Sequence, residues 1–143
     1  MVNKNTSHLA GEFLVAGELS RRGYPVSITF GNAKSVDIYA DTRDRTIKVD
    51  AKAGRAKGNW PLDRGSIEPD VYYIFVYLQT RNRIRENAAP EYFIVLGKDI
   101  LSKGLIRTWG TRHGIRYRTL NTSDYKERWD LLPRPPEEAE DVS

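Results

Sequence analysis

Two aspartates and a lysine lie within segments whose composition is otherwise typical of β-strands. Asp37 stands between Val36 and Ile38, and Lys52 follows two residues after Asp50. Asp is disfavoured inside a strand, and a buried carboxylate must be paired, hydrogen-bonded or bound to a metal. Two carboxylates that meet beside a lysine can hold a hard divalent cation next to a positive charge. The alternative for Asp50 and Lys52 is an ordinary solvated face of an antiparallel sheet.

The two strands that carry these charges are expected to form a hairpin. Residues 36–40 and 46–52 are β-type, and the polar residues 41–45 between them are typical of a turn. Because strand side chains alternate between faces, Asp50 and Lys52 share one face of the second strand. The hairpin therefore predicts that the two aspartates can meet across neighbouring strands.

A third carboxylate, Glu12, lies on a helix that we expect over Thr6–Arg22, ended by Gly23. On a helical wheel of about 100° per residue, Glu12 falls at the edge of the apolar stripe and Glu18 points away from it. Glu12 is then either a boundary residue that pairs with an arginine or a carboxylate aimed at the two aspartates. The predicted apolar stripe consists of Leu9, Phe13, Ala16 and Ser20.

The remaining pattern predicts an α/β domain with a mixed central β-sheet of about five strands, flanked by helices. The segment 54–68 is irregular, and the apolar run 71–78 is typical of a central strand buried on both faces. We expect one domain over residues 1–132 and a disordered acidic, proline-rich tail over 133–143. The other expected elements are strands over 25–30 and 91–96 and short helices over 99–105 and 123–132.

Length and composition narrow the class of protein. The 143 residues suit one domain with a hydrophobic core, and the absence of cysteine excludes disulfides and disfavours structural zinc. The sequence contains no apolar run long enough to span a membrane and no signal-peptide pattern, so we expect a cytoplasmic protein without a membrane partner. The net charge of +4 permits a nucleic-acid partner without requiring one.

Basic and aromatic residues are interleaved in two stretches, 54–68 and 107–118, as is typical of segments that contact phosphates and bases. The alternatives are a Trp60 that closes the edge of the core, and arginines that only solubilise loops. The candidate nucleic-acid contacts are Lys34, Arg55, Lys57, Trp60, Arg64, Arg112 and Arg116. The two histidines, His8 and His113, belong to no pattern that suggests a role.

Taken in order, Glu12 on the first helix, Asp37 on the second strand and Asp50-Ala51-Lys52 on the third resemble the motif of the PD-(D/E)xK nuclease superfamily. The chain is similar in particular to its small single-domain members, such as archaeal Holliday-junction resolvases and uncharacterised prokaryotic nucleases. The resemblance covers about residues 6–54, and the later strands match only in general pattern. The chain departs from the family by Val36 in place of proline and by the lack of a long helix after the third strand.

The resemblance implies a restriction-endonuclease-like core and a Mg²⁺- or Mn²⁺-dependent endonuclease that hydrolyses DNA phosphodiester bonds, in duplex, branched or junction substrates. It implies that Asp37, Asp50 and the backbone carbonyl of Ala51 bind the metal. It further implies that Lys52 orients the water or stabilises negative charge, and that Glu12 binds a second ion or positions a metal-bound water. A homodimer and a prokaryotic or phage origin are also expected from the family.

Two other functions compete with a nuclease. A protein of the same fold could bind nucleic acid without catalysis, and its binding would need no divalent metal. A structural protein would instead pair its acids internally with lysines or arginines and would have no affinity for DNA. The position of the three carboxylates relative to one another separates these possibilities, because metal ligation requires that their oxygens converge.

Overall fold

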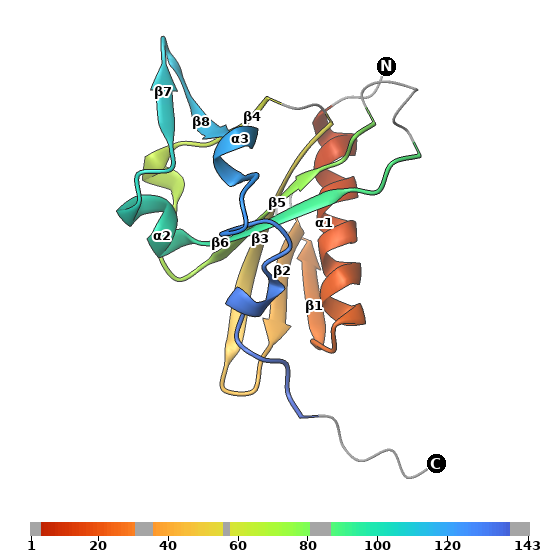
Figure 1. Cartoon of the computed structure of the whole chain (residues 1–143). Helices are drawn as coiled ribbons and strands as arrows, with labels where there is room; N and C mark the ends of the chain where they lie inside the picture. Colours follow the sequence, from red (N-terminus) through yellow and green to blue (C-terminus); the bar gives the residue numbers. More distant parts are fainter. Residues whose placement is uncertain (1–3, 31–35, 56–57, 81–86, 138–143) are drawn as a thin grey trace.

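A computed structural model of the chain describes residues 4–30, 36–55, 58–80 and 87–137 (Figure 1). The first helix and the first three strands lie close to the predicted positions. Helix α1 spans Lys4–Arg21, and Gly23, with a φ of 97°, follows its last turn. The strands are β1 (Val26–Phe30), β2 (Val36–Asp41) and β3 (Thr46–Gly54), so the hairpin that carries the aspartates is confirmed.

These strands belong to a mixed five-stranded sheet with the order β1-β2-β3-β5-β6. Strands β1, β2 and β3 are antiparallel neighbours, β5 (Tyr72–Tyr77) is parallel to β3, and β6 (Glu91–Leu96) is antiparallel to β5. Every residue of β5 is buried, as predicted for a strand that is covered on both faces. The α/β class with a mixed sheet of about five strands is therefore confirmed.

Two hydrophobic clusters lie on opposite faces of this sheet. Helix α1 covers one face, where Val15 and Leu19 pack with the inward side chains of β2 and β3 (Figure 1). The other face packs against a second, three-stranded sheet with the order β4-β8-β7, and Trp60 is one of the buried residues of that cluster. The elements on this side are β4 (Asn59–Pro61), η1 (Arg64–Ser66), α2 (Gly97–Ser102), β7 (Arg107–Trp109), β8 (Arg112–Arg116) and α3 (Tyr117–Leu120).

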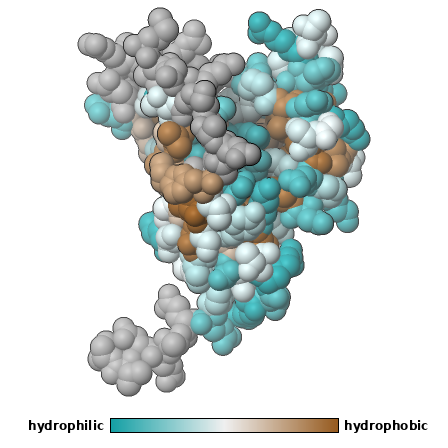
Figure 2. All heavy atoms as spheres, turned by 180° about the vertical axis from the view of Figure 1, so that it is seen from behind, coloured by the Kyte–Doolittle hydropathy of each residue, from teal (hydrophilic) through white to brown (hydrophobic). Residues whose placement is uncertain are grey.

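The predicted buried face of α1 is largely wrong, because only Ala16 of its four residues is buried. Leu9 and Phe13 are 40% and 52% exposed, whereas Val15 and Leu19 are fully buried. On a wheel of about 100° per residue the buried face is turned by roughly 90° from the predicted stripe, which places Glu12 inside it. Leu9, Phe13 and Leu14 consequently reach the surface. In the view from behind, Figure 2 shows hydrophobic areas among hydrophilic ones.

Close packing of α1 on β3 explains this rotation. A Cβ atom added to Gly11 would overlap the Cβ atom of Ala53, so the helix approaches the strand through a position that carries no side chain. Glycine is the residue that permits such an approach of backbone to a neighbour. The contact between Gly11 and Ala53 therefore sets which side of α1 faces the sheet.

The C-terminal part of the chain differs most from expectation. The helix predicted over 123–132 is reduced to a 3-10 turn, η3 (Trp129–Leu131), in which Trp129 is buried while Leu131 is 39% exposed. Residues 133–137, predicted as part of a disordered tail, contact the domain. The Tyr24 hydroxyl donates to the Pro133 carbonyl at 2.6 Å, and the Arg43 amide donates to the Arg134 carbonyl at 2.9 Å. None of the helices in the described residues is long and apolar enough to cross a membrane.

The tight contact at Gly11 generates a stability prediction. Gly11→Ala should lower the free energy of unfolding by about 1–3 kcal/mol, the usual cost of overpacking, because the added methyl group must displace Ala53 or the helix. Gly17→Ala is the matched control on the same helix, since a Cβ there meets nothing within 4 Å. It should raise stability by about 1 kcal/mol through helix propensity. Urea unfolding followed by circular dichroism measures both, and equal effects would contradict the contact.

Candidate active site

The two predicted aspartates project from adjacent strands on the same face. Asp37 pairs with Thr29 of β1, and the described pairing of β2 with β3 includes Ile38 opposite Val49. One further step in that antiparallel register places Asp37 opposite Asp50. Directly opposed residues of an antiparallel pair have Cβ atoms about 4.5–5.5 Å apart and point to the same side. The two aspartates therefore follow the last printed pair of this register, and both line the same pocket.

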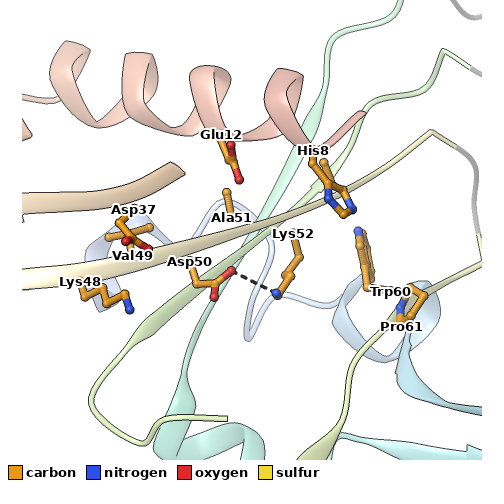
Figure 3. A pocket seen from close by; sticks show the side chains of 11 residues that line it. His8, Glu12, Asp37, Lys48, Val49, Asp50, Ala51, Lys52, Trp60 and Pro61 are labelled. Atoms are coloured by element: carbon orange, nitrogen blue, oxygen red, sulfur yellow. Dashed lines mark ion pairs between the residues drawn. The ribbon is translucent and has the colours of Figure 1, made fainter. Parts of the chain in front are cut away.

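A pocket lies beside β3 at this point (Figure 3). All five residues predicted for catalysis and metal binding line it, from three elements that are separated in the sequence by up to 40 positions. Helix α1 supplies the glutamate, β2 the first aspartate, and β3 the aspartate, alanine and lysine. The pocket is lined by His8, Glu12, Asp37, Lys48, Val49, Asp50, Ala51, Lys52, Ala53, Trp60 and Pro61.

The carboxylates approach the pocket from two sides of β3. Asp50 and Lys52 pair in register with Tyr73 and Phe75 of β5, which belong to the cluster on the side away from α1. Glu12 lies on the α1 side, above Ala51 in Figure 3, and its Oε2 atom is buried. Among residues 4–30, 36–55, 58–80 and 87–137, no three acidic or histidine side chains are grouped closely enough to hold one metal ion. The shared pocket is thus found, whereas the predicted three-carboxylate cluster is not formed in this conformation.

Asp50 and Lys52 form an ion pair along the strand face. The Lys52 Nζ atom lies 3.3 Å from the Asp50 Oδ1 atom, and both side chains are 35% exposed. Solvent screens a pair exposed to this extent, so it adds little to stability. Its significance is positional, since it holds an ammonium group beside the carboxylate that would bind a metal. Lys48, on the same face of β3, lies 3.8 Å from Glu68.

Tyr73 of β5 is the register partner of Asp50 and lies beside it in the sheet. Burial raises the pKa of the Tyr73 phenol, and the negative charge of Asp50 raises it further. The phenol therefore stays protonated and neutral at neutral pH. Its oxygen accepts a hydrogen bond from the Glu68 amide at 2.9 Å, which fixes the ring beside the carboxylate.

The donors present suit Mg²⁺ or Mn²⁺. These hard cations bind carboxylate and carbonyl oxygens, and Mg²⁺ commonly takes only one or two protein carboxylates, with waters and substrate phosphates completing its shell. Asp37 and Asp50 supply two carboxylates from one side, and Ala51 also lines the pocket. Softer metals that prefer thiolates find no ligand here, because the chain contains no cysteine.

His8 is a pocket residue that the sequence analysis left without a role. It precedes Glu12 by four positions on α1, one helical turn, so the two side chains share a face of the helix. Figure 3 shows the imidazole between the helix and the indole of Trp60, on the lysine side of the pocket. The i, i+4 spacing of His8 and Glu12 could have indicated that His8 lines the pocket. The spacing supports that prediction only if Glu12 itself faces the pocket.

Trp60 lines the pocket but is only 5% exposed. This burial favours the alternative that Trp60 closes the edge of the core. Its indole N–H donates to the Val76 carbonyl at 3.3 Å. Its ring centroid lies 5.4 Å from that of Phe75 and 5.7 Å from that of Phe93. A ring held in this way offers no open surface to a base, so the predicted stacking role is not supported.

The other predicted nucleic-acid contacts are dispersed. The Arg55 guanidinium donates to Ser7 Oγ at 2.8 Å and to Thr80 Oγ1, so it joins α1 to the segment that follows β5. Arg64 is exposed in η1, while Arg112 and Arg116 lie on β8. Lys34 and Lys57 lie outside the described residues.

Comparison with known protein families, curated proteins and solved structures finds no match for this chain. The pocket residues and their chemistry are therefore the basis on which a function can be proposed.

Metal binding at the two aspartates is testable without any enzymatic assay. Mn²⁺ at about ten times its dissociation constant should stabilise the protein by about 1.4 kcal/mol. That stabilisation should raise Tm by roughly 5 °C for a domain of this size. Asp37→Asn and Asp50→Asn should each remove the shift in a thermal-denaturation experiment. Asp44→Asn, an exposed aspartate in the β2–β3 turn, is the control and should keep it. An unchanged shift in both pocket variants would place the ion elsewhere.

Proposed function

We propose that this protein is a metal-dependent nuclease of the PD-(D/E)xK type, with a restriction-endonuclease-like core, that hydrolyses phosphodiester bonds of DNA. The observation that carries the proposal is that Glu12, Asp37, Asp50 and Lys52 line one pocket. The family motif has a carboxylate on the first helix, an aspartate on the second strand and D/E-x-K on the third strand. In this chain α1, β2 and β3 carry the corresponding residues. The fold departs from the family pattern after β3, where β4 and η1 replace a long helix.

Phosphodiester hydrolysis requires a water nucleophile and stabilisation of the negative charge that develops on the phosphate. A bound Mg²⁺ or Mn²⁺ would polarise the phosphate and lower the pKa of a coordinated water. In this chain Asp37, Asp50 and the Ala51 carbonyl would hold the ion. Lys52 stands beside Asp50 on the same face, where its ammonium group would orient the attacking water or stabilise the developing charge.

Glu12 has a different position from the aspartates and hence a different role. It is buried on the α1 side of β3, and it reaches the same pocket from there. A carboxylate in that place would bind a second ion or position a metal-bound water. Its burial restricts the side chain, so the fold holds it ready for that role.

The second candidate is a nucleic-acid-binding protein of the same fold without catalysis. Two observations favour it: among the described residues no three acidic or histidine side chains are grouped closely enough to hold a metal, and the Asp50 carboxylate is already paired with Lys52. Such a protein would bind DNA equally well in EDTA and in Mg²⁺. It would also bind normally when Asp37 is replaced by asparagine.

DNA is the proposed partner and substrate, and a homodimer would allow both strands of a duplex to be cut. The structural class of the DNA is best found by a cleavage screen over plasmid, linear, single-stranded and four-way junction substrates in Mg²⁺ and in Mn²⁺. Preference for the junction would support a structure-selective endonuclease.

The catalytic assignment predicts the behaviour of two variants. Lys52→Met and Asp50→Asn should each lower the cleavage rate by about 100-fold or more, because the first removes a group that stabilises the developing negative charge and the second removes a ligand of the metal ion. Lys98→Met, an exposed lysine on α2, is the control and should cut at the wild-type rate. Circular dichroism confirms that all three proteins are folded. Wild-type cleavage by Lys52→Met would refute the assignment.

A further inference from the structure

The outer face of the three-stranded sheet carries a concentration of arginines. In the β7–β8 pair, Arg107 is opposite Gly114 and Trp109 is opposite Arg112. Opposed residues of an antiparallel pair share a face, and so do residues two apart on one strand. Arg116, two residues after Gly114, therefore lies on the same face as Arg107, Trp109 and Arg112.

This arginine face points away from the hydrophobic core. Trp60 of β4 is opposite Ile115 of β8, and both are buried in the cluster beneath the sheet. Side chains at alternate positions must then point to the other side, where Arg107 and Arg112 are exposed. Figure 1 shows the β7–β8 hairpin projecting from the body of the molecule, at the end away from the β2–β3 turn.

One surface cavity on this part of the molecule is lined by three arginines, Arg107, Arg116 and Arg118, and by the hydroxyl-bearing Thr108 and Thr119. All five side chains can donate hydrogen bonds, and the three guanidinium groups can only donate. No acidic residue is among those that line the cavity. Guanidinium groups gathered in this way repel one another, and a bound anion would remove that repulsion.

An aromatic contact holds one of these arginines in place. The Arg116 guanidinium carbon lies 5.1 Å from the centroid of the Trp109 ring, within the range of a cation–π interaction. Arg116 is partly buried, whereas Arg107 and Arg118 are exposed. The ring thus orders a phosphate-binding group before any ligand arrives, which reduces the entropy lost on binding.

We infer that this cavity binds a backbone phosphate of a nucleic-acid strand. Arginine matches phosphate oxygens with paired N–H donors, and threonine hydroxyls commonly add contacts to the same group. The identification of the anion as a nucleic-acid phosphate rests on the proposed nuclease function, whereas the anion site itself rests on the arginines. The cavity shares no lining residue with the pocket at Asp50, so it is a second contact point and not part of the catalytic pocket.

The test is a binding measurement in which no cleavage can occur. Fluorescence anisotropy of a labelled DNA duplex in EDTA gives the affinity over a series of salt concentrations. The double variant Arg107→Gln/Arg116→Gln should bind about 10- to 100-fold more weakly. The slope of log affinity against log salt should also become shallower by about 0.9 for each lost phosphate contact. Arg45→Gln, an exposed arginine in the β2–β3 turn, is the matched control and should change neither quantity.

The outcomes separate this inference from the proposed function. If the double variant keeps the wild-type affinity and salt slope, or if the wild-type protein does not bind DNA, the inference is overturned. If inorganic phosphate binds in an arginine-dependent manner while DNA does not compete, the ligand is free phosphate and the nucleic-acid assignment fails. If the arginine variants lose DNA binding although no metal or substrate yields cleavage, the phosphate site stands and the nuclease proposal falls.

Discussion

Strand β3 is the element on which the rest of the structure depends, because every other layer makes contact with it. Helix α1 presses on one face through Gly11, the aromatic cluster around Trp60 lies toward the other, and β5 runs parallel along one edge. At the other edge β2 pairs along the half of the strand that precedes Asp50. The candidate pocket lies next to residues 48–53 of β3, where residues from both sides of the strand line one space.

The carboxylates of the candidate metal site lie on two sides of β3. Asp37 and Asp50 follow the last register pair of β2 with β3, Ile38 opposite Val49, and both line the pocket. Lys52 is beside Asp50 because two residues along a strand return to the same face. Glu12 reaches the pocket from the helix side and is buried there. A divalent ion that joined the two sides would have to draw the carboxylates closer than they lie in this conformation.

The second sheet gives the molecule two surfaces with different chemistry. Its inner side contributes Trp60 and Ile115 to the core, and its outer side carries the arginines of β7 and β8. Because side chains alternate between the two faces of a strand, this sheet presents apolar residues to the core and arginines to the outside. An anion held at the cationic face would lie on the same molecule as the pocket at Asp50 but away from its carboxylates, which would repel it.

The sequence by itself determined the features that depend on local backbone geometry. Alternation along a strand placed Asp50 and Lys52 on one face, and the polar turn after residue 40 predicted the hairpin that brings Asp37 to them. The tertiary structure alone decided which side of α1 faces the sheet, and hence that Glu12 and His8 line the pocket while Leu9 and Phe13 are exposed. It also decided that Trp60 is buried and that the residues after Leu132 contact the domain. The physical reason is that strand periodicity is a property of consecutive residues, whereas the rotation of a helix depends on contacts such as Gly11 with Ala53, which are remote in the chain.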